Sequence, residues 1–217
     1  MVKEVGIGEL SQKKKLIYIN DINSYMAGRL FDRLEQEAFK AGIQARTKES
    51  MAWFKKRVST MRVSRAKLLT DGPIRSQQVY GSMYNFQYDP KLKQVLPYYD
   101  RFPLCIPIQK AKGGFHGLNL HYLHPRVRAQ FLDALMDSVT NEKYDRTTRM
   151  RLSYNIIKQS SKLRWFKPCF KHYLSKHLQS RLLLIEPADW EIAIFLPTDS
   201  FRKVAAESVW SKSRKIV

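Results

Sequence analysis

Lys and Arg outnumber Asp and Glu by 39 to 19 in this chain, so its 217 residues carry a formal net charge of +20 at pH 7. Hydrophobic residues make up 44% of the chain and aromatic residues 12%, which is too apolar for a disordered basic tail. A compact body with this much positive charge repels itself unless a polyanion neutralises it. Nucleic acid is therefore the leading partner, and the alternative is an acidic neighbour in a large assembly.

The length is sufficient for one large domain, or for a domain with a helical extension, around a sizeable core. No stretch approaches the roughly 20 consecutive apolar residues of a membrane span, so no membrane partner is expected. The first residues lack the apolar region of a secretory signal. Cys105 and Cys169 are far apart and have no metal-ligand spacing. Two inert thiols in a reducing cytosol are therefore predicted, and a single disulfide between them is the alternative.

The N-terminal third has helical periodicity. Asp21 or Asn23 is the predicted cap of a first helix, which Gly42 ends. Thr47 opens a second helix, whose apolar residues recur at helical spacing until Asp71-Gly72-Pro73 closes it. Residues 21–70 are therefore predicted to form a helical hairpin.

The middle of the chain changes to strand spacing. Residues 84–88, 104–108 and 115–123 are predicted strands, with a hairpin turn at Gly113-Gly114 between the last two. Because Pro107 cannot donate to a ladder, the strand at 104–108 is expected at a sheet edge or bent.

Helices are predicted from Pro125 and after Asp145, strands at 182–186 and 190–196, and a last helix capped by Thr198 or Asp199. The mixture indicates an α+β fold: a small antiparallel sheet or partly closed β-barrel buttressed by helices, with the N-terminal helical hairpin. Two domains are predicted, an arm with the basic hairpin at 1–75 and an α+β core at 76–217.

Two basic blocks are candidates for nucleic-acid contact. The first is the predicted helix at 46–67, whose cations could follow a phosphate backbone or could belong to an ordinary solvated face. The second, residues 158–181, has no acidic residue and interleaves cations with aromatic side chains, a combination that holds phosphates and stacks bases. In the alternative interpretation the aromatic side chains belong to the core and only the cations are exposed. The candidate residues are Lys55, Lys56, Arg57, Arg62, Arg65, Lys67, Lys162, Arg164, Trp165, Lys167, Lys171, Lys176 and Arg181.

Histidines do not suggest a metal centre. On one strand His116 and His121 point to opposite faces because their separation is odd, and no nearby Cys completes a site. His172 and His177 are five apart on a predicted helix, where a two-ligand site needs four. No metal and no cofactor is expected.

A nuclease is the catalytic alternative. Asp71 followed by Asp89-Pro90-Lys91 imitates the spacing of carboxylates and lysine in one class of metal-dependent nucleases. Pro90 breaks the strand geometry that such a site needs, and Pro187 likewise places the acidic cluster Glu186, Asp189 and Glu191 in a loop. No phosphate loop, nucleophile elbow or zinc-protease motif is present, so the sequence predicts no enzyme.

Several longer motifs resemble those of a known family. They are GSMYNFQYDP at 81–90, LPYYDRFPL at 96–104, GFHGLNLHYL at 114–123, WFKPC at 165–169 and WEIAIFLP at 190–197. The chain resembles a family of virion proteins of T4-like contractile-tailed bacteriophages, the DNA end protectors. The resemblance implies a protein made in the host cytoplasm that joins the particle at the head or neck and binds the ends of the packaged genome. It brings no site residues with it.

Charge and resemblance together predict a non-enzymatic virion protein that binds the DNA backbone without sequence readout, because phosphate contacts carry no base information. Other phage virion proteins are expected partners, and an oligomer is expected within the particle. The alternative is a structural subunit of the tail, baseplate or head-tail connector, whose basic surface contacts acidic protein neighbours.

Overall fold

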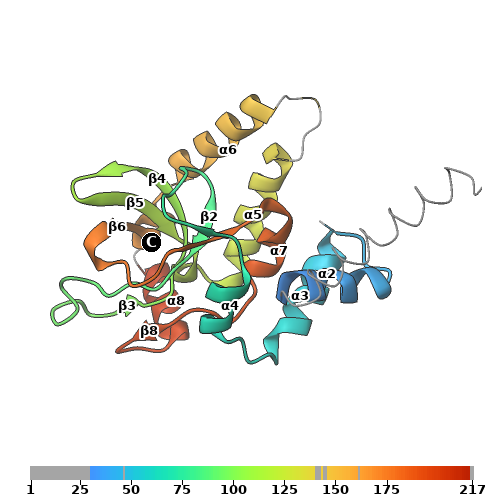
Figure 1. The fold of residues 1–217 in the computed structure, drawn as a ribbon, viewed down its shortest axis with the longest axis horizontal. Helices are drawn as coiled ribbons and strands as arrows, with labels where there is room; N and C mark the ends of the chain where they lie inside the picture. The colour runs from blue at the N-terminus through green and yellow to red at the C-terminus, as the bar shows by residue number, and fades with distance from the viewer. Residues whose placement is uncertain (1–29, 46, 140–142, 144–145, 161, 216–217) are drawn as a thin grey trace, which may run out of the picture.

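A six-stranded antiparallel sheet forms the centre of the fold (Figure 1), which is known from a computed structural model that describes residues 30–45, 47–139, 143, 146–160 and 162–215. Its order is β1 (Ile74–Arg75), β7 (Leu182–Ile185), β2 (Met83–Asn85), β4 (Leu104–Ala111), β5 (Gly114–Asn119) and β6 (Phe170–Leu174). Two short strands, β3 (Tyr99–Asp100) and β8 (Phe201–Arg202), pair separately. The sheet is open, so the prediction of an α+β fold with a small antiparallel sheet is confirmed and the barrel does not close.

Helices gather on one side and at one end of this sheet. In Figure 1, α2 (Leu30–Lys40) and α3 (Lys48–Ser59) lie at one end of the molecule and the β4–β5 hairpin lies at the other. Between these ends lie α5 (Pro125–Val139) and α7 (Trp190–Ala193). The remaining helices are α4 (Arg65–Asp71), α6 (Arg146–Ser160) and α8 (Ala206–Lys215), with short 3₁₀ turns η1 (Leu120–Tyr122), η2 (Arg164–Cys169), η3 (Ser175–His177) and η4 (Pro187–Asp189). No described helix has the length and apolar character needed to cross a lipid bilayer.

Local signals explain the helices that carry the first basic block. Gly42 ends the α2 segment with φ at +70°, and Thr47 begins α3 through reciprocal hydrogen bonds with Ser50, as predicted. The predicted second helix is wrong in one respect, because it is two helices. α3 ends at Ser59, and the hydroxyl of Ser64 accepts a hydrogen bond from the Lys67 amide and starts α4. The part of the predicted first helix before Leu30 lies outside the described residues.

Alternation along the strands produces two cores. Met83, Leu104 and Ile106 face the helices, while Tyr84 and Cys105, which alternate with them, belong to a smaller cluster on the other side. This second cluster is largely aromatic: the ring centroids of Phe86 and Tyr173 are 5.3 Å apart, and those of Phe115 and Tyr173 are 5.4 Å apart. The aromatic residues of the central motifs therefore act mainly as packing.

Three further predictions are corrected. The strand predicted at 190–196 is wrong, because this stretch begins with the helix α7. Trp190 through Ile194 are all buried, so the hydrophobic period of the stretch could not distinguish a helix from a strand. The strand β4 is internal, not at an edge, and Pro107 is accommodated by an irregularity between Pro107 and Gln109, which confirms the bent alternative. The last helix begins at Ala206, because Phe201 and Arg202 first form β8.

The strand predicted at 115–123 is also shorter than expected. It ends at Asn119, whose side chain accepts a hydrogen bond from the His121 amide and begins η1. The helices from Pro125 and after Asp145 are confirmed. The division of the chain at residue 75 stays a prediction.

Candidate nucleic-acid interface

Three consecutive cations lie on the outer face of α3. Lys55, Lys56 and Arg57 are exposed, while Phe54 and Val58 on the opposite face are buried. Arg57 donates from Nε to Glu37 Oε2 at 2.7 Å; this hydrogen bond raises the pKa of the Arg57 guanidinium and lowers that of the Glu37 carboxyl. Within the described part of the chain Lys55 and Lys56 make no ion pair, so their charge faces solvent.

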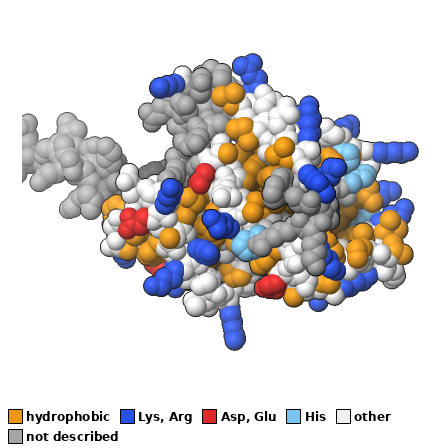
Figure 2. All heavy atoms as spheres, turned by 180° about the vertical axis from the view of Figure 1, so that it is seen from behind, with side chains coloured by type: hydrophobic (Ala, Val, Ile, Leu, Met, Phe, Trp, Pro, Cys, Tyr) orange, Lys and Arg blue, Asp and Glu red, His pale blue; other side chains and the backbone are white. Residues whose placement is uncertain are grey.

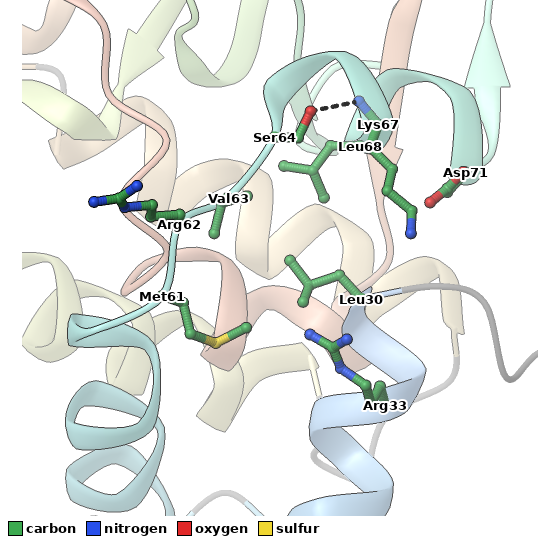
Figure 3. Close-up of a pocket in the computed structure, with 9 residues that line it drawn as sticks. All are labelled: Leu30, Arg33, Met61, Arg62, Val63, Ser64, Lys67, Leu68 and Asp71. Atoms are coloured by element: carbon green, nitrogen blue, oxygen red, sulfur yellow. Dashed lines mark hydrogen bonds between the residues drawn. The ribbon is translucent and has the colours of Figure 1, made fainter.

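A basic pocket of about 200 Å³ lies beyond the C-terminal end of α3, between α2, the 60–64 linker and α4 (Figure 3). Arg33 and Lys67 point toward each other across the gap between α2 and α4, whereas the guanidinium of Arg62, on the linker, points away from this gap. Leu30, Met61, Val63 and Leu68 supply an apolar lining, and Asp71 is an acidic group at its edge. The structure thus brings the predicted residue Lys67 together with Arg33, which the sequence reasoning missed although it belongs to the predicted first helix. The predicted residue Arg62 belongs to the pocket lining, but its guanidinium points away.

Arg65 is placed differently from its neighbours. Its guanidinium is half-buried and donates from Nε to the Thr198 carbonyl at 2.7 Å and from the terminal nitrogen to the Asp199 carbonyl. These bonds attach α4 to the segment before β8, so this side chain also has a structural task.

The second basic block runs from Lys162, which precedes η2, through η2, β6 and η3 to Arg181, which precedes β7. Lys162, Arg164, Lys167, Lys176 and Arg181 are exposed. Lys171 is half-buried on β6, with its Nζ 4.0 Å from the centroid of the Tyr122 ring. The predicted aromatic partner Trp165 lies in η2, and its side chain is outside the described residues.

The two blocks lie on different parts of the molecule. In Figure 1, α3 and β6 stand at opposite ends, so no single element carries both. Figure 2 shows Lys and Arg side chains over much of the rear face, with few Asp or Glu side chains among them, and several cations beside histidines at one edge. The chain therefore presents a broadly positive rear face.

The histidines serve as packing and hydrogen-bonding groups. His116 and His172 lie on paired strands with ring centroids 5.1 Å apart; burial, followed by the charge of His172, lowers the pKa of His116. The helix predicted around His172 is wrong, because that residue belongs to β6. His177 bonds through Nδ1 with the Asp89 carbonyl at 2.9 Å. Among the described residues no three His, Cys, Asp or Glu side chains are grouped as metal ligands would be.

The carboxylates of the nuclease alternative have other partners. Asp89 Oδ2 lies 2.7 Å from Lys93 Nζ, and this hydrogen bond lowers the pKa of Asp89. Asp71 stands at the end of α4 on the basic pocket. In the other acidic group, Asp189 is buried and Glu191 accepts a buried hydrogen bond from the Ser50 hydroxyl, which joins α3 to α7.

A buried polar network, which sequence reasoning missed, joins distant segments. His121 Nδ1 lies 2.7 Å from Asp100 Oδ2, and Thr198 Oγ1 lies 3.2 Å from His121 Nε2. The order carboxylate, imidazole, hydroxyl matches that of hydrolase triads, but His121 is fully buried, so a substrate cannot reach it. Residues 100, 121 and 198 lie in segments whose spacing gave no signal of a common site.

Comparison with known proteins identifies the family. A family model described as phage T4 terminal DNA protecting protein matches residues 4–213, and the chain therefore belongs to this bacteriophage family. None of the curated proteins matches the chain, and none of the solved structures does. The resemblance in the sequence is thus confirmed, and with it a place among proteins that protect the ends of DNA.

Proposed function

We propose that this member of the terminal DNA protecting family binds the ends of the packaged phage genome through their phosphates, without reading sequence. The protein is made in the host cytoplasm and enters the virion at the head or neck, as an oligomer in contact with other virion proteins. The family match supports the role at DNA ends. The net charge of +20 supports a polyanionic partner.

The observation that carries the proposal is the group of cations around α3 and α4. Lys55 and Lys56 face solvent without ion pairs among the described residues, and Arg33, Arg62 and Lys67 surround one pocket. A pocket of about 200 Å³ into which the Arg33 guanidinium and the Lys67 ammonium group point has the size and charge to accept a backbone phosphate. The exposed lysines of α3 then contact neighbouring phosphates.

The second block extends this contact. Lys162, Arg164, Lys167, Lys176 and Arg181 are exposed, and β6, which lies between η2 and η3 in the chain, stands at the opposite end of the molecule from α3 (Figure 1). Two separated groups of cations suit a partner longer than the protein's own width, as a DNA duplex is. Because none of these groups requires a particular base edge, the contact is independent of sequence.

No catalytic step is part of the proposal. The family is one of structural, DNA-protecting proteins. Asp89 is paired with Lys93, and His121 and Thr198 of the Asp100–His121–Thr198 network are fully buried. This absence of nuclease activity can be tested by incubating duplex DNA with Mg²⁺ and the protein, and we expect no cleavage of the DNA.

A salt titration with blunt duplex DNA tests the function. We expect affinity to fall steeply between about 50 and about 200 mM salt, as several phosphate contacts require. In parallel, linear DNA mixed with the protein should resist an exonuclease that starts at ends, and circular DNA of the same sequence serves as the binding competitor. Absence of binding at low salt would favour a structural subunit that contacts acidic proteins.

A further inference from the structure

A second pocket, of about 370 Å³, opens between the 90–99 loop, η1 and β6. This volume lies within the roughly 300–1,000 Å³ of small-molecule sites. Its lining differs from that of the basic pocket, because aromatic rings predominate: Tyr98, Tyr122 and Phe170 take part, with Lys171 among them. Tyr98 and Phe170 are half-buried, so part of each ring is accessible.

Two tyrosines of this pocket each have a lysine beside the ring, and of these two lysines Lys171 lines the pocket while Lys212 lies outside its lining. The rings of Tyr98 and Tyr122 have centroids 6.0 Å apart. The Nζ of Lys171 lies 4.0 Å from the Tyr122 centroid, and the Nζ of Lys212, on α8, lies 5.3 Å from the Tyr98 centroid. Adjacent rings with an ammonium group at each are suited to a ligand that has both a flat face and a negative charge.

Lys171 lacks an anionic partner in the described part of the chain. It is half-buried and makes no ion pair with any described carboxylate, and this burial lowers the pKa of its ammonium group. Asp100 also lines the pocket, but its two oxygens already accept hydrogen bonds from the Phe102 and Ser200 amides, Asn119 and His121. A lysine held in an apolar site without a counter-ion is stabilised when an anion enters beside it.

The rim of this pocket carries an exposed apolar side chain. Leu92, which lines the pocket from the 90–99 loop, is 58% exposed. His172 and Lys91 are exposed lining residues and add polar groups at the same opening. The pocket therefore offers ring faces and an apolar rim to one part of a ligand and cations to another part.

We propose that this pocket binds one nucleoside monophosphate unit, supplied by the terminal nucleotide of DNA, with its base against Tyr98 and its phosphate at Lys171. A terminal nucleotide can leave the stack at a small cost, whereas an internal one must also break its pairing and two stacking contacts. The pocket therefore distinguishes an end from the duplex interior. This inference rests on the proposed function, since it assigns the part of the partner that makes binding specific for ends.

The test measures the binding of two duplexes by fluorescence anisotropy. One is a blunt duplex with 5′-phosphates, and the other is the same duplex closed by a hairpin loop at each end. Free thymidine monophosphate is added as a competitor. The variants are Lys171→Met, which keeps the side-chain volume, and Tyr98→Ala. The matched control is Lys176→Gln, which removes an exposed cation from the same basic block but not from the pocket. Thermal unfolding shows that each variant is folded, and Tyr98→Ala, at a half-exposed position, gives the result if Lys171→Met does not fold.

For the native protein we expect the open duplex to bind about tenfold more tightly than the closed one, the size of one charge-assisted contact. Lys171→Met and Tyr98→Ala should bring this ratio close to one, and Lys176→Gln should weaken both probes equally. An unchanged ratio in both pocket variants would overturn the inference, while steep salt dependence would still support the proposed function. Absence of binding to either duplex would overturn the proposed function instead. Competition by thymidine monophosphate without preference for open ends would assign the pocket to a free nucleotide and refute its role at DNA ends.

Discussion

His121 and Asp100 form a buried pair whose side chains are 0% and 1% exposed, with Nδ1 and Oδ2 2.7 Å apart. Burial by itself raises the pKa of Asp100, but the charge and hydrogen bond of His121 outweigh it, together with the Phe102 amide and the Asn119 side chain. The pKa of this carboxyl is therefore below its ordinary value. The pair joins β3, η1 and the segment before β8, and through Asp100 it also supports one wall of the aromatic pocket.

Asp100→Ala should lower the free energy of unfolding by about 3–5 kcal/mol, because it leaves a buried imidazole and two backbone amides without their acceptor. Urea unfolding at neutral pH measures the change. Asp89→Ala is the control, since its carboxylate is at the surface and its loss should leave the midpoint almost unchanged. Equal effects of the two substitutions would show that the buried network does not stabilise the fold.

The same pair predicts a pH dependence. Because the pKa of Asp100 is lowered in the folded state, its ionised form adds stability above the unfolded pKa of about 4, and this stability is lost as the pH falls through the folded pKa. Between neutral and strongly acid pH the native protein should therefore lose more stability than Asp100→Ala does. Parallel curves for the two proteins would contradict the assigned direction of the shift.

Both cysteine thiols should be unreactive in the native protein. Cys105 and Cys169 are buried, and burial raises the pKa of both thiols, that of Cys169 to about 12. Since the thiolate is the reactive form, Ellman's reagent should label neither residue at mildly alkaline pH and both after denaturation. Ala52→Cys, at an exposed position of α3, provides a positive control. Rapid labelling without this added cysteine would show that the fold opens readily around β4, which carries Cys105, or around η2, which carries Cys169.

Two adjacent glycines at the β4–β5 turn should respond very differently to alanine. Gly113 has φ at +74°, and a Cβ there would meet Leu174 Cδ2 at 3.6 Å, an ordinary contact distance, so Gly113→Ala should cost about 1–2 kcal/mol. At Gly114 a Cβ would collide with the backbone carbonyl of Tyr173 on β6, which cannot move without breaking the β5–β6 pairing. Gly114→Ala should therefore cost at least about 3 kcal/mol in thermal or urea unfolding. Similar costs for both variants would mean that β6 adjusts more easily than its pairing implies.

Sequence signals predicted the elements whose boundaries are local. Thr47 as a cap, Gly42 as a helix end and Gly113-Gly114 as a turn each act within a few residues, and each is confirmed. The break between α3 and α4 was missed because hydrophobic spacing continues across residues 60–64 while the backbone does not. The helix α7 was missed because an entirely buried run has no informative period.

The candidate site shows the same division. Basic blocks can be found by counting charges, and Lys55 and Lys56 are exposed as a nucleic-acid interface requires. Contacts between residues far apart in the sequence cannot be found in this way. Arg33 belongs to the basic pocket although it lies on a different helix from Lys67. Tyr98 and Lys171 lie on either side of Tyr122, and only the folded structure brings them together. The sequence therefore predicts the chemistry of the surface better than its pockets.

The last prediction concerns the cations of α3. Changing Lys55, Lys56 and Arg57 together to Ala should weaken DNA binding about equally for unrelated sequences and flatten the dependence of log Kd on log salt. Each phosphate contact contributes about 0.9 to that slope, and Arg57 is already paired with Glu37. We therefore expect the slope to fall by about two, most of it reproduced by the Lys55 and Lys56 changes alone.

Titrations of two duplexes with unrelated sequences measure this slope. Lys93→Ala serves as the control, because this lysine is held by Asp89 and belongs to neither basic block. A loss of affinity confined to one duplex would indicate base readout and refute a backbone contact. A triple variant with the native slope would place the DNA elsewhere on the molecule, and the exposed cations of η2 and η3 would then be the surface to change next.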